Sequence, residues 1–172
     1  MDNFTTLYKA DCQRNGGGVI LKFLYYFRRI QTTSNPFLRK YYKMRFRKLS
    51  EKRGLEIPYS CRIGKGLYLG HAFNITIHHD TVIGNNCNIH KGVTIGQENR
   101  GDRKGCPTIG NQVYIGINAV VSGKITIGDD VLIGPNCHVN CDVPSHSIVI
   151  GNPCIIKHRD NATMGYVNCG VQ

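Results

Sequence analysis

An aliphatic residue returns about every six positions from Ile63 onward, and this period limits the chain to very few folds. The aliphatic residue is usually followed by glycine. Three six-residue units make one triangular turn of a parallel β-helix, with each aliphatic side chain stacked on its equivalent in the next turn. The period therefore predicts a mainly β fold, a parallel β-helix of hexapeptide repeats, and solenoids of this repeat class are usually left-handed. The repeated positions are Ile63, Leu69, Ile83, Ile89, Ile95, Ile109, Ile115, Val121, Ile127, Ile133 and Val139.

The fifth position of each unit is also mostly small or apolar, as expected if it faces the narrow interior too. Cys87, Cys137 and Phe73 occupy this position, so we expect all three side chains to pack inside the coil. A β-sandwich would require alternating faces and turn signals at about every 8–12 residues instead of a six-residue period. The β-helix is therefore the preferred fold.

The period is interrupted twice, and a closed coil can extrude additional residues only outward. The step from Ile75 to Ile83 is eight residues, and the step from Ile95 to Ile109 is fourteen. The second interruption predicts an external loop around residues 97–104. Loops of this kind often carry functional side chains, although an insertion without a role would give the same pattern.

Composition divides the chain into a basic helical segment over residues 1–54, the β-helix over residues 55–157 and a tail over residues 158–172. Within the first segment, residues 1–18 look like a loose leader because they contain three consecutive glycines. The last residues of the tail carry no pattern, and we expect them to be flexible.

Two helices are expected in the basic segment. An apolar run begins at Val19 and ends in Arg28-Arg29, which fits a first helix. Asn35-Pro36 then interrupts the chain, and a second helix is predicted from Pro36 to about Arg53, ending at Gly54. The first helix is too short and too charged to span a bilayer.

The eight cysteines raise the question of a disulfide framework. We identify no signal peptide before them, and several occupy positions that face the interior of the coil. No Cys-x-x-Cys pair occurs, so a structural zinc site has weak support. Reduced thiols and a cytoplasmic location are therefore expected.

The formal net charge of +11 is concentrated in residues 19–53, which carry eleven Lys or Arg and one acid, Glu51. The remaining chain has eleven basic and ten acidic residues, so we expect no nucleic-acid partner for the β-helix. Two interpretations of the basic segment stay open. Its aromatic, aliphatic and basic side chains fit a peripheral contact with an anionic membrane, which would be the inner membrane surface. Alternatively, the apolar face packs on a neighbouring helix or a partner subunit.

The stretch LEIPYSCRIGKGLYLGHA, from Leu55 to Ala72, resembles the serine acetyltransferase family and its relatives that acetylate bacterial exopolysaccharides. The resemblance continues through residues 93–96, the external loop and residues 143–153, and covers roughly residues 54–157. Serine acetyltransferases carry a much longer N-terminal helical domain, which this chain does not match. The resemblance implies a left-handed β-helix and an O-acetyltransferase activity.

The same resemblance implies a set of catalytic residues. In the family a histidine is the general base, and an acid fifteen positions earlier orients it; these positions are His71 and Glu56 here. The acid is usually Asp, so Glu56 is one methylene longer. His71 would take the proton of an acceptor hydroxyl as this attacks acetyl-CoA, and would then protonate the departing thiolate. Backbone N–H groups near Gly96 and Gln97 would stabilise the oxyanion.

The resemblance also implies where acetyl-CoA, the expected co-substrate, would bind. CoA lies in the groove between neighbouring solenoids, which generally form homotrimers about a three-fold axis. A basic side chain near the C-terminus meets the CoA phosphates, and no metal is expected. The positions that match the CoA site are Gly116, Ile117, Asn140, Cys141 and Lys157.

The expected acceptor site differs from that of serine acetyltransferases, which have Asp immediately before the catalytic histidine and an Arg-His pair in the external loop. Here Gly70 has the place of the Asp, and the loop offers Asp102, Arg103 and Lys104 as acceptor-binding candidates. An absent charge-assisted hydrogen bond costs about 1.5–3 kcal/mol. We therefore expect a small-molecule or glycan acceptor, preferably a sugar or polysaccharide precursor, with L-serine as the alternative.

Two other classes of protein are weighed against this interpretation. A zinc enzyme of the γ-carbonic anhydrase type also uses such a solenoid, as a trimer in which three histidines from adjacent subunits surround the zinc. The histidines that it could recruit here are His71, His78, His79 and His90. A solenoid without catalytic activity would serve as a binding scaffold. The Gly-His-Ala setting of His71 and the long loop favour the acetyltransferase over both.

Overall fold

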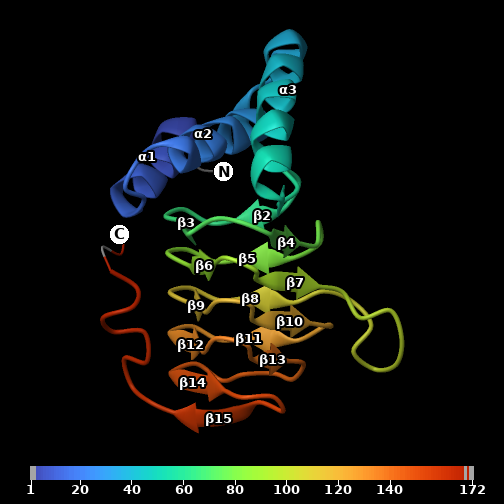
Figure 1. Cartoon of the computed structure of the whole chain (residues 1–172), viewed down its shortest axis with the longest axis vertical. Helices are drawn as coiled ribbons and strands as arrows, with labels where there is room; N and C mark the ends of the chain where they lie inside the picture. The colour runs from blue at the N-terminus through green and yellow to red at the C-terminus, as the bar shows by residue number, and fades with distance from the viewer. Residues whose placement is uncertain (1–2, 169, 171–172) are drawn as a thin grey trace.

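The computed structural model describes residues 3–168 and residue 170, and shows three helices at one end of a coil of short strands (Figure 1). The helices are α1 (Phe4–Arg14), α2 (Val19–Thr32) and α3 (Pro36–Arg53). The strands are β1 (Leu55–Glu56), β2 (Arg62–Ile63), β3 (Tyr68–Gly70), β4 (Ile75–Ile77), β5 (Val82–Ile83), β6 (Asn88–His90), β7 (Thr94–Gly96), β8 (Thr108–Ile109), β9 (Tyr114–Ile115), β10 (Val120–Ser122), β11 (Thr126–Ile127), β12 (Val131–Ile133), β13 (His138–Val139), β14 (Ser147–Ile150) and β15 (Ile155–His158).

The strands form three sheets that run along the sides of the coil. We name them sheet A (β1, β4, β7, β10 and β13), sheet B (β2, β5, β8 and β11) and sheet C (β3, β6, β9, β12, β14 and β15). Each strand pairs in parallel with its equivalent one turn later, so that Glu56 lies beside Thr76 and Thr76 beside Thr94. Only β14 and β15 pair antiparallel among the named strands. The predicted parallel β-helix is therefore confirmed.

The repeated aliphatic side chains fill the inside of the coil. Every one of them has at most 7% of its surface exposed. Cys87 and Cys137 are buried among them, as predicted. The prediction for Phe73 is wrong, because this ring is 48% exposed and lies beneath the Arg53 guanidinium, 4.7 Å from it. At this corner the C-terminal end of α3 covers the coil, so the ring packs on a cation outside the coil instead.

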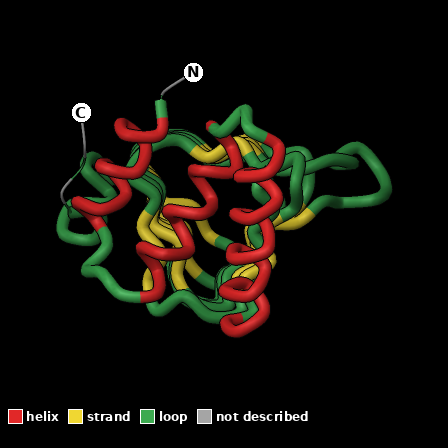
Figure 2. The backbone as a smooth tube through the Cα atoms, turned by 90° about the horizontal axis from the view of Figure 1, so that it is seen from above, coloured by secondary structure: helices red, strands yellow, loops and turns green. Residues whose placement is uncertain are grey.

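The helices cover the open end of the first turn (Figure 2). The apolar face of α2 is fully buried through Phe23, Leu24, Phe27 and Ile30, and Phe23 stacks on Phe46 of α3 at 4.8 Å between ring centres. Of the two interpretations of the basic segment, packing within the fold therefore holds for the apolar face of α2. No helix among the described residues is long and apolar enough to cross a membrane.

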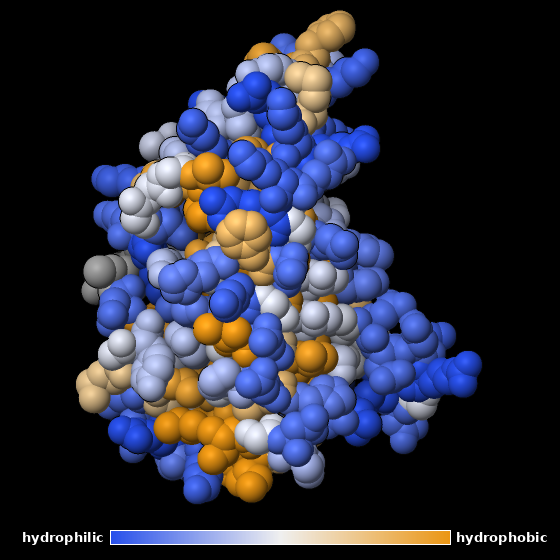
Figure 3. All heavy atoms as spheres, in the orientation of Figure 1, coloured by the Kyte–Doolittle hydropathy of each residue, from blue (hydrophilic) through white to orange (hydrophobic). Residues whose placement is uncertain are grey.

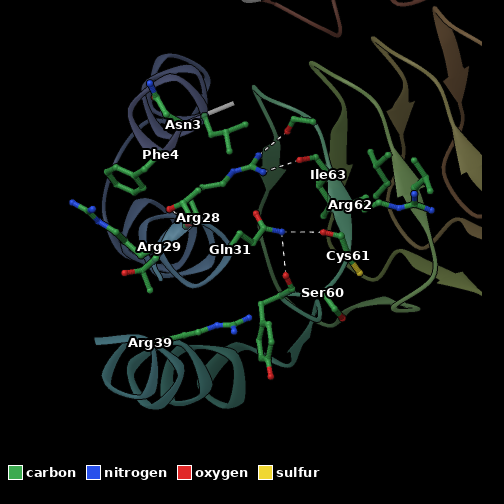
Figure 4. Close-up of a pocket in the computed structure, with 17 residues that line it drawn as sticks. Asn3, Phe4, Arg28, Arg29, Gln31, Arg39, Ser60, Cys61, Arg62 and Ile63 are labelled. Atoms are coloured by element: carbon green, nitrogen blue, oxygen red, sulfur yellow. Dashed lines mark hydrogen bonds between the residues drawn. The ribbon is translucent and has the colours of Figure 1, made fainter. Parts of the chain in front are cut away.

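The expected loose leader is wrong, because α1 occupies most of it and is tied to the β-helix. Asp11 is fully buried and forms an ion pair with Arg28 of α2. Arg28 also donates hydrogen bonds to the carbonyls of Ile63 and Gly64, and Gln31 donates to the carbonyl of Cys61 (Figure 4). Polar side chains of the helices thus provide hydrogen bonds for backbone carbonyls of the first turn. A leader without structure would leave these carbonyls without such partners.

The second predicted helix is confirmed with its bounds as α3. The Asn35 side chain accepts hydrogen bonds from the N–H groups of Phe37 and Leu38, as an N-cap does. Gly54 ends the helix in the left-handed conformation with φ 60°, where a side chain would be strained.

The chain after β15 returns along the outside of the coil toward α1 (Figure 1). Its Thr163 hydroxyl donates to Asp130 at 2.6 Å, and its Tyr166 ring packs on Tyr114 at 5.1 Å. The expected flexible tail is therefore attached through Asn168, whose carbonyl accepts from Arg14. Residues 169, 171 and 172 of that tail lie outside the described residues.

Candidate active site

A groove of about 650 Å³ lies between α3 and the part of sheet A that borders sheet B. Glu56 lines it from the outer face of β1 and accepts a hydrogen bond from the Thr76 hydroxyl at 3.4 Å. The groove brings together two predicted site residues, Glu56 and Gly96. It is also lined by basic and imidazole side chains that the sequence analysis did not include in the acetyltransferase site. These added groups are Lys43, Arg47, His78 and His79.

Cys106, at the end of the external loop, contacts this groove through His78. Its Sγ lies 3.0 Å from Nδ1 of His78. Burial and the neighbouring Asp80 carboxylate raise the pKa of the Cys106 thiol, and burial raises the pKa of Cys61 to about 11. Both thiols are therefore protonated near neutral pH, which makes a covalent acetyl-cysteine an unfavourable route.

The predicted external loop is confirmed and projects from the side of the coil between β7 and β8 (Figure 1). Its base is closed by a pair of hydrogen bonds between Glu98 and Gly105, of 2.9 and 3.0 Å. Three predicted acceptor-binding side chains are exposed on it, and so is Gln97 at its start. These three are Asp102, Arg103 and Lys104. Within the described chain, none of them forms a hydrogen bond or ion pair with Glu56 or His71.

His71 lies at the opposite edge of sheet A, at the turn that leads from β3 into β4. It is exposed and has φ 50°, a left-handed conformation that is uncommon outside glycine. No hydrogen bond or ion pair joins His71 and Glu56 in the part of the chain that the structure describes. The register explains this, because Glu56 pairs with Thr76, five residues beyond His71 along the coil.

His90 lies near His71 and beside Gly70, with which it is paired in sheet C. A side chain at Gly70 would meet the His90 ring, which is itself held between Tyr68 and Tyr114 at 5.9 and 4.7 Å. The Nε2 atom of His90 is buried without a hydrogen-bond partner. Burial, together with the nearby His71, lowers the pKa of His90. His90 is therefore a neutral imidazole that fills the space beside position 70.

The predicted CoA-binding residues are divided between two edges of sheet A and the end of the coil. Gly116 and Ile117 follow β9 at the edge that also carries His71. Asn140 and Cys141 follow β13, the last strand of sheet A, at the edge that borders sheet B, and the Cys141 thiol lies 3.9 Å from the Cys154 thiol. Lys157 is exposed on β15. One copy of the chain therefore does not gather these residues at one place.

Metal-ligating side chains lie at two separate places within one chain. Donor atoms of His78, His79 and Asp80 lie within 4.8 Å of one another, and the latter two side chains are largely exposed. His71 and His90 lie at the other edge of sheet A.

Comparison with known proteins identifies relatives of the β-helix. Residues 106–141 match the sequence family described as bacterial transferase hexapeptide (six repeats). Over 99 residues the chain is 40% identical to the serine acetyltransferase of Helicobacter pylori, which covers 58% of this chain and 58% of that protein. The chain therefore spans little more than half the length of this relative.

Solved structures show the same architecture. The serine acetyltransferase of Neisseria gonorrhoeae in complex with serine is 28% identical, with a TM-score of 0.66 over 90% of this chain and 67% of that one. The Brucella abortus serine acetyltransferase in complex with coenzyme A is 26% identical, with a TM-score of 0.65 over 81% of this chain and 54% of that one. The resemblance seen in the sequence is thus confirmed: the chain is a hexapeptide-repeat protein similar to the serine acetyltransferases.

Proposed function

We propose that the protein is an acetyl-CoA-dependent O-acetyltransferase. The observation that carries the proposal is that Glu56 and His71 stand at the positions of the family's acid and base in a chain that is 40% identical to a serine acetyltransferase over 99 residues. His71 is exposed and free to accept the proton of an acceptor hydroxyl as that oxygen attacks the thioester. The same proton then goes to the CoA thiolate as it leaves. General-base assistance of this kind contributes about 10²–10⁴-fold.

The comparisons favour L-serine as the acceptor over the sugar that the sequence analysis preferred. All the relatives described above are serine acetyltransferases, and one of them holds serine. The groove also supplies positive charge through Lys43 and Arg47, which suits the carboxylate of an amino acid. These helix residues would replace the Arg-His pair that the external loop lacks.

A sugar acceptor remains the second candidate because of one observation at position 70. The His90 ring occupies the space that a carboxylate at this position would need. Without that carboxylate, the ammonium group of serine has one ionic partner fewer. A neutral hydroxyl-rich acceptor would not require it.

The division of the candidate residues supports a homotrimer as the active form. Glu56 and the groove lie toward one edge of sheet A, whereas His71, Gly116 and Ile117 lie at the other. In a closed three-fold ring, one edge of each subunit faces the opposite edge of its neighbour. Each active site would then be built from two subunits, and CoA would lie in the groove between them.

The first experiment is thiol release from acetyl-CoA with L-serine and with a panel of sugars and nucleotide sugars. We expect transfer to serine that falls at least about 100-fold in His71→Ala. Lys9→Ala serves as the control, because Lys9 is an exposed residue of α1 that belongs to none of the predicted site residues. Transfer only to a sugar would select the second candidate. Activity that survives in His71→Ala with either acceptor would remove His71 as the base.

A further inference from the structure

Helix α3 has two apolar faces, and only one of them is used by the fold. Phe46 is buried against α2, and Tyr42 and Leu49 are packed on the same core. On the opposite side Phe37, Tyr41 and Met44 recur at the i, i+4 and i+7 positions of one helical face. Their exposed fractions are 83%, 47% and 61%. Apolar side chains of this size that line up in the solvent indicate a contact with something outside the chain.

The end of α3 that carries this face projects beyond the rest of the fold. Figure 1 shows the N-terminal end of the helix rising clear of α1 and α2, and Figure 3 shows apolar atoms at that end with hydrophilic atoms around them. Leu38, 47% exposed, lies next to Phe37 in the first turn. The free end of the helix can therefore meet a flat surface without a clash from the β-helix.

The charge on α3 decides what kind of surface fits. The helix carries eight Lys or Arg side chains and one acid. Glu51 is paired with Arg47, and this is the one ion pair that the described part of the chain forms on α3. Lys40, Lys48 and Lys52 lie on the same side of the helix as Phe37 and Met44. Two copies of α3 brought face to face would repel each other, whereas an anionic surface would be attracted.

We propose that the exposed face of α3 binds the surface of a membrane that contains anionic lipids. Phe37, Leu38 and Met44 would enter the boundary between headgroups and acyl chains, and the lysines beside them would contact lipid phosphates. A helix with an apolar stripe and a strongly basic polar face is the form that lies in such an interface. The contact is peripheral, and it involves α3 instead of the buried apolar face of α2.

The test uses the absence of tryptophan from this sequence. Phe37→Trp places a single fluorescent reporter on the proposed face, and Tyr166→Trp places one at a half-exposed ring of the C-terminal segment, beside Tyr114 on the coil. With vesicles of phosphatidylcholine and phosphatidylglycerol, we expect a blue shift of the Phe37→Trp emission and quenching by brominated acyl chains. Tyr166→Trp should not respond, and neither variant should respond to pure phosphatidylcholine.

Sedimentation with the same vesicles measures which side chains bind. Replacing Phe37 and Met44 with Ser should abolish sedimentation, while the matched control Ile155→Ser with Met164→Ser, two exposed apolar residues elsewhere, should leave it unchanged. Replacing Lys40 and Lys48 with Gln should weaken binding roughly 30-fold, given the usual contribution of a basic residue near an anionic surface. None of these residues lines the groove.

Three results would overturn the proposal. The first is an unshifted Phe37→Trp emission with anionic vesicles. The second is a shift that depends on protein concentration without vesicles, which would make α3 a contact between copies. The third is preferential binding of RNA in competition with the vesicles. Circular dichroism of each variant separates loss of binding from loss of folding.

Discussion

Arg28 and Asp11 form a buried ion pair that joins α1, α2 and the first turn of the β-helix. Nε of Arg28 lies 2.8 Å from Oδ2 of Asp11, and both side chains are at most 1% exposed. The remaining guanidinium N–H groups reach the carbonyls of Ile63 and Gly64, and the N–H of Leu67 donates to Asp11. The helices are thus attached to the coil through a polar contact that has no access to water.

Removal of Arg28 alone should be strongly destabilising. Arg28→Met leaves the Asp11 carboxylate buried without its partner, and we expect the free energy of unfolding to fall by about 3–5 kcal/mol. Adding Asp11→Leu should restore part of the loss, because the unpaired charge is then gone. Urea unfolding of the two single variants and the double variant measures the coupling. Strictly additive losses would contradict a paired role, and Arg47→Met, which breaks an exposed pair on α3, should have little effect.

Asp130 should make the attachment of the C-terminal segment dependent on pH. Burial acts to raise its pKa, but hydrogen bonds from the hydroxyl and N–H of Thr163, from His146 and from Ala162 outweigh it, so the pKa is lowered. A lowered folded-state pKa gives stability that is present above the unfolded-state value and is lost as the pH falls through the folded-state value. The segment should therefore detach under acidic conditions below about pH 4.

The Asp130→Asn variant separates this contribution from that of other carboxylates. At neutral pH we expect it to lower the protection of the Thr163 amide by about 1.5–3 kcal/mol, since the acceptor loses its charge. Hydrogen exchange of that amide at neutral and acidic pH is the measurement. The difference between wild type and variant should shrink as the pH falls. A difference that is constant with pH would show that the charge of Asp130 is not what holds the segment.

Two inactive variants should restore activity when mixed. If Glu56 and His71 act together across a subunit interface, then Glu56→Gln and His71→Ala trimers, after exchange of subunits, contain some interfaces with both native residues. Random mixing of equal amounts gives about a quarter of the wild-type number of sites. Thiol release before and after exchange provides the measurement. A mixture that stays inactive after confirmed exchange would place both residues of one site on the same chain.

Position 70 should report on acceptor choice through its contact with His90. Gly70→Asp alone should destabilise the protein, because the new side chain meets the His90 ring between Tyr68 and Tyr114. Combining it with His90→Ala should relieve the contact and place a carboxylate beside His71. We then expect kcat/KM for L-serine to rise relative to any sugar by about 10–100-fold, the value of one charge-assisted hydrogen bond.

The control for this experiment is His90→Ala alone, which opens the space without adding the charge. It should not change the preference between acceptors. An equal rise in His90→Ala and in the double variant would mean that the size of the site, and not its charge, selects the acceptor.

The sequence predicts those parts of the molecule that depend on local repetition. The inward side chains from Ile63 to Val139 follow from a six-residue period, and α3 follows from Asn35-Pro36 and Gly54 at its two ends. The helix α1 was missed because what holds it is a contact between Asp11 and Arg28 that no local pattern reveals. Phe73 was misplaced because the repeat cannot anticipate a cation from α3 at that corner.

In the candidate site, too, the local sequence identifies residues but does not give the contacts between distant parts of the chain. Glu56 and His71 could be named from a motif, yet the motif does not say that they lie toward opposite edges of one sheet. That separation comes from the register of β1 beside β4. The contact of His90 with Gly70 links residues twenty positions apart, and only the pairing of β3 with β6 brings them together.

The antiparallel strand β15 hinders end-to-end polymerisation of the coil. A parallel β-helix has an unpaired strand edge at each end, and a second molecule could continue the ladder there without limit. Here β15 turns back on β14 in the reverse direction, so the last edge of sheet C no longer matches the first turn of another copy. At the other end, α1 and α2 cover the first turn and bond its carbonyls. The chain itself therefore blocks continuation of the ladder at the first turn and at the last strand of sheet C.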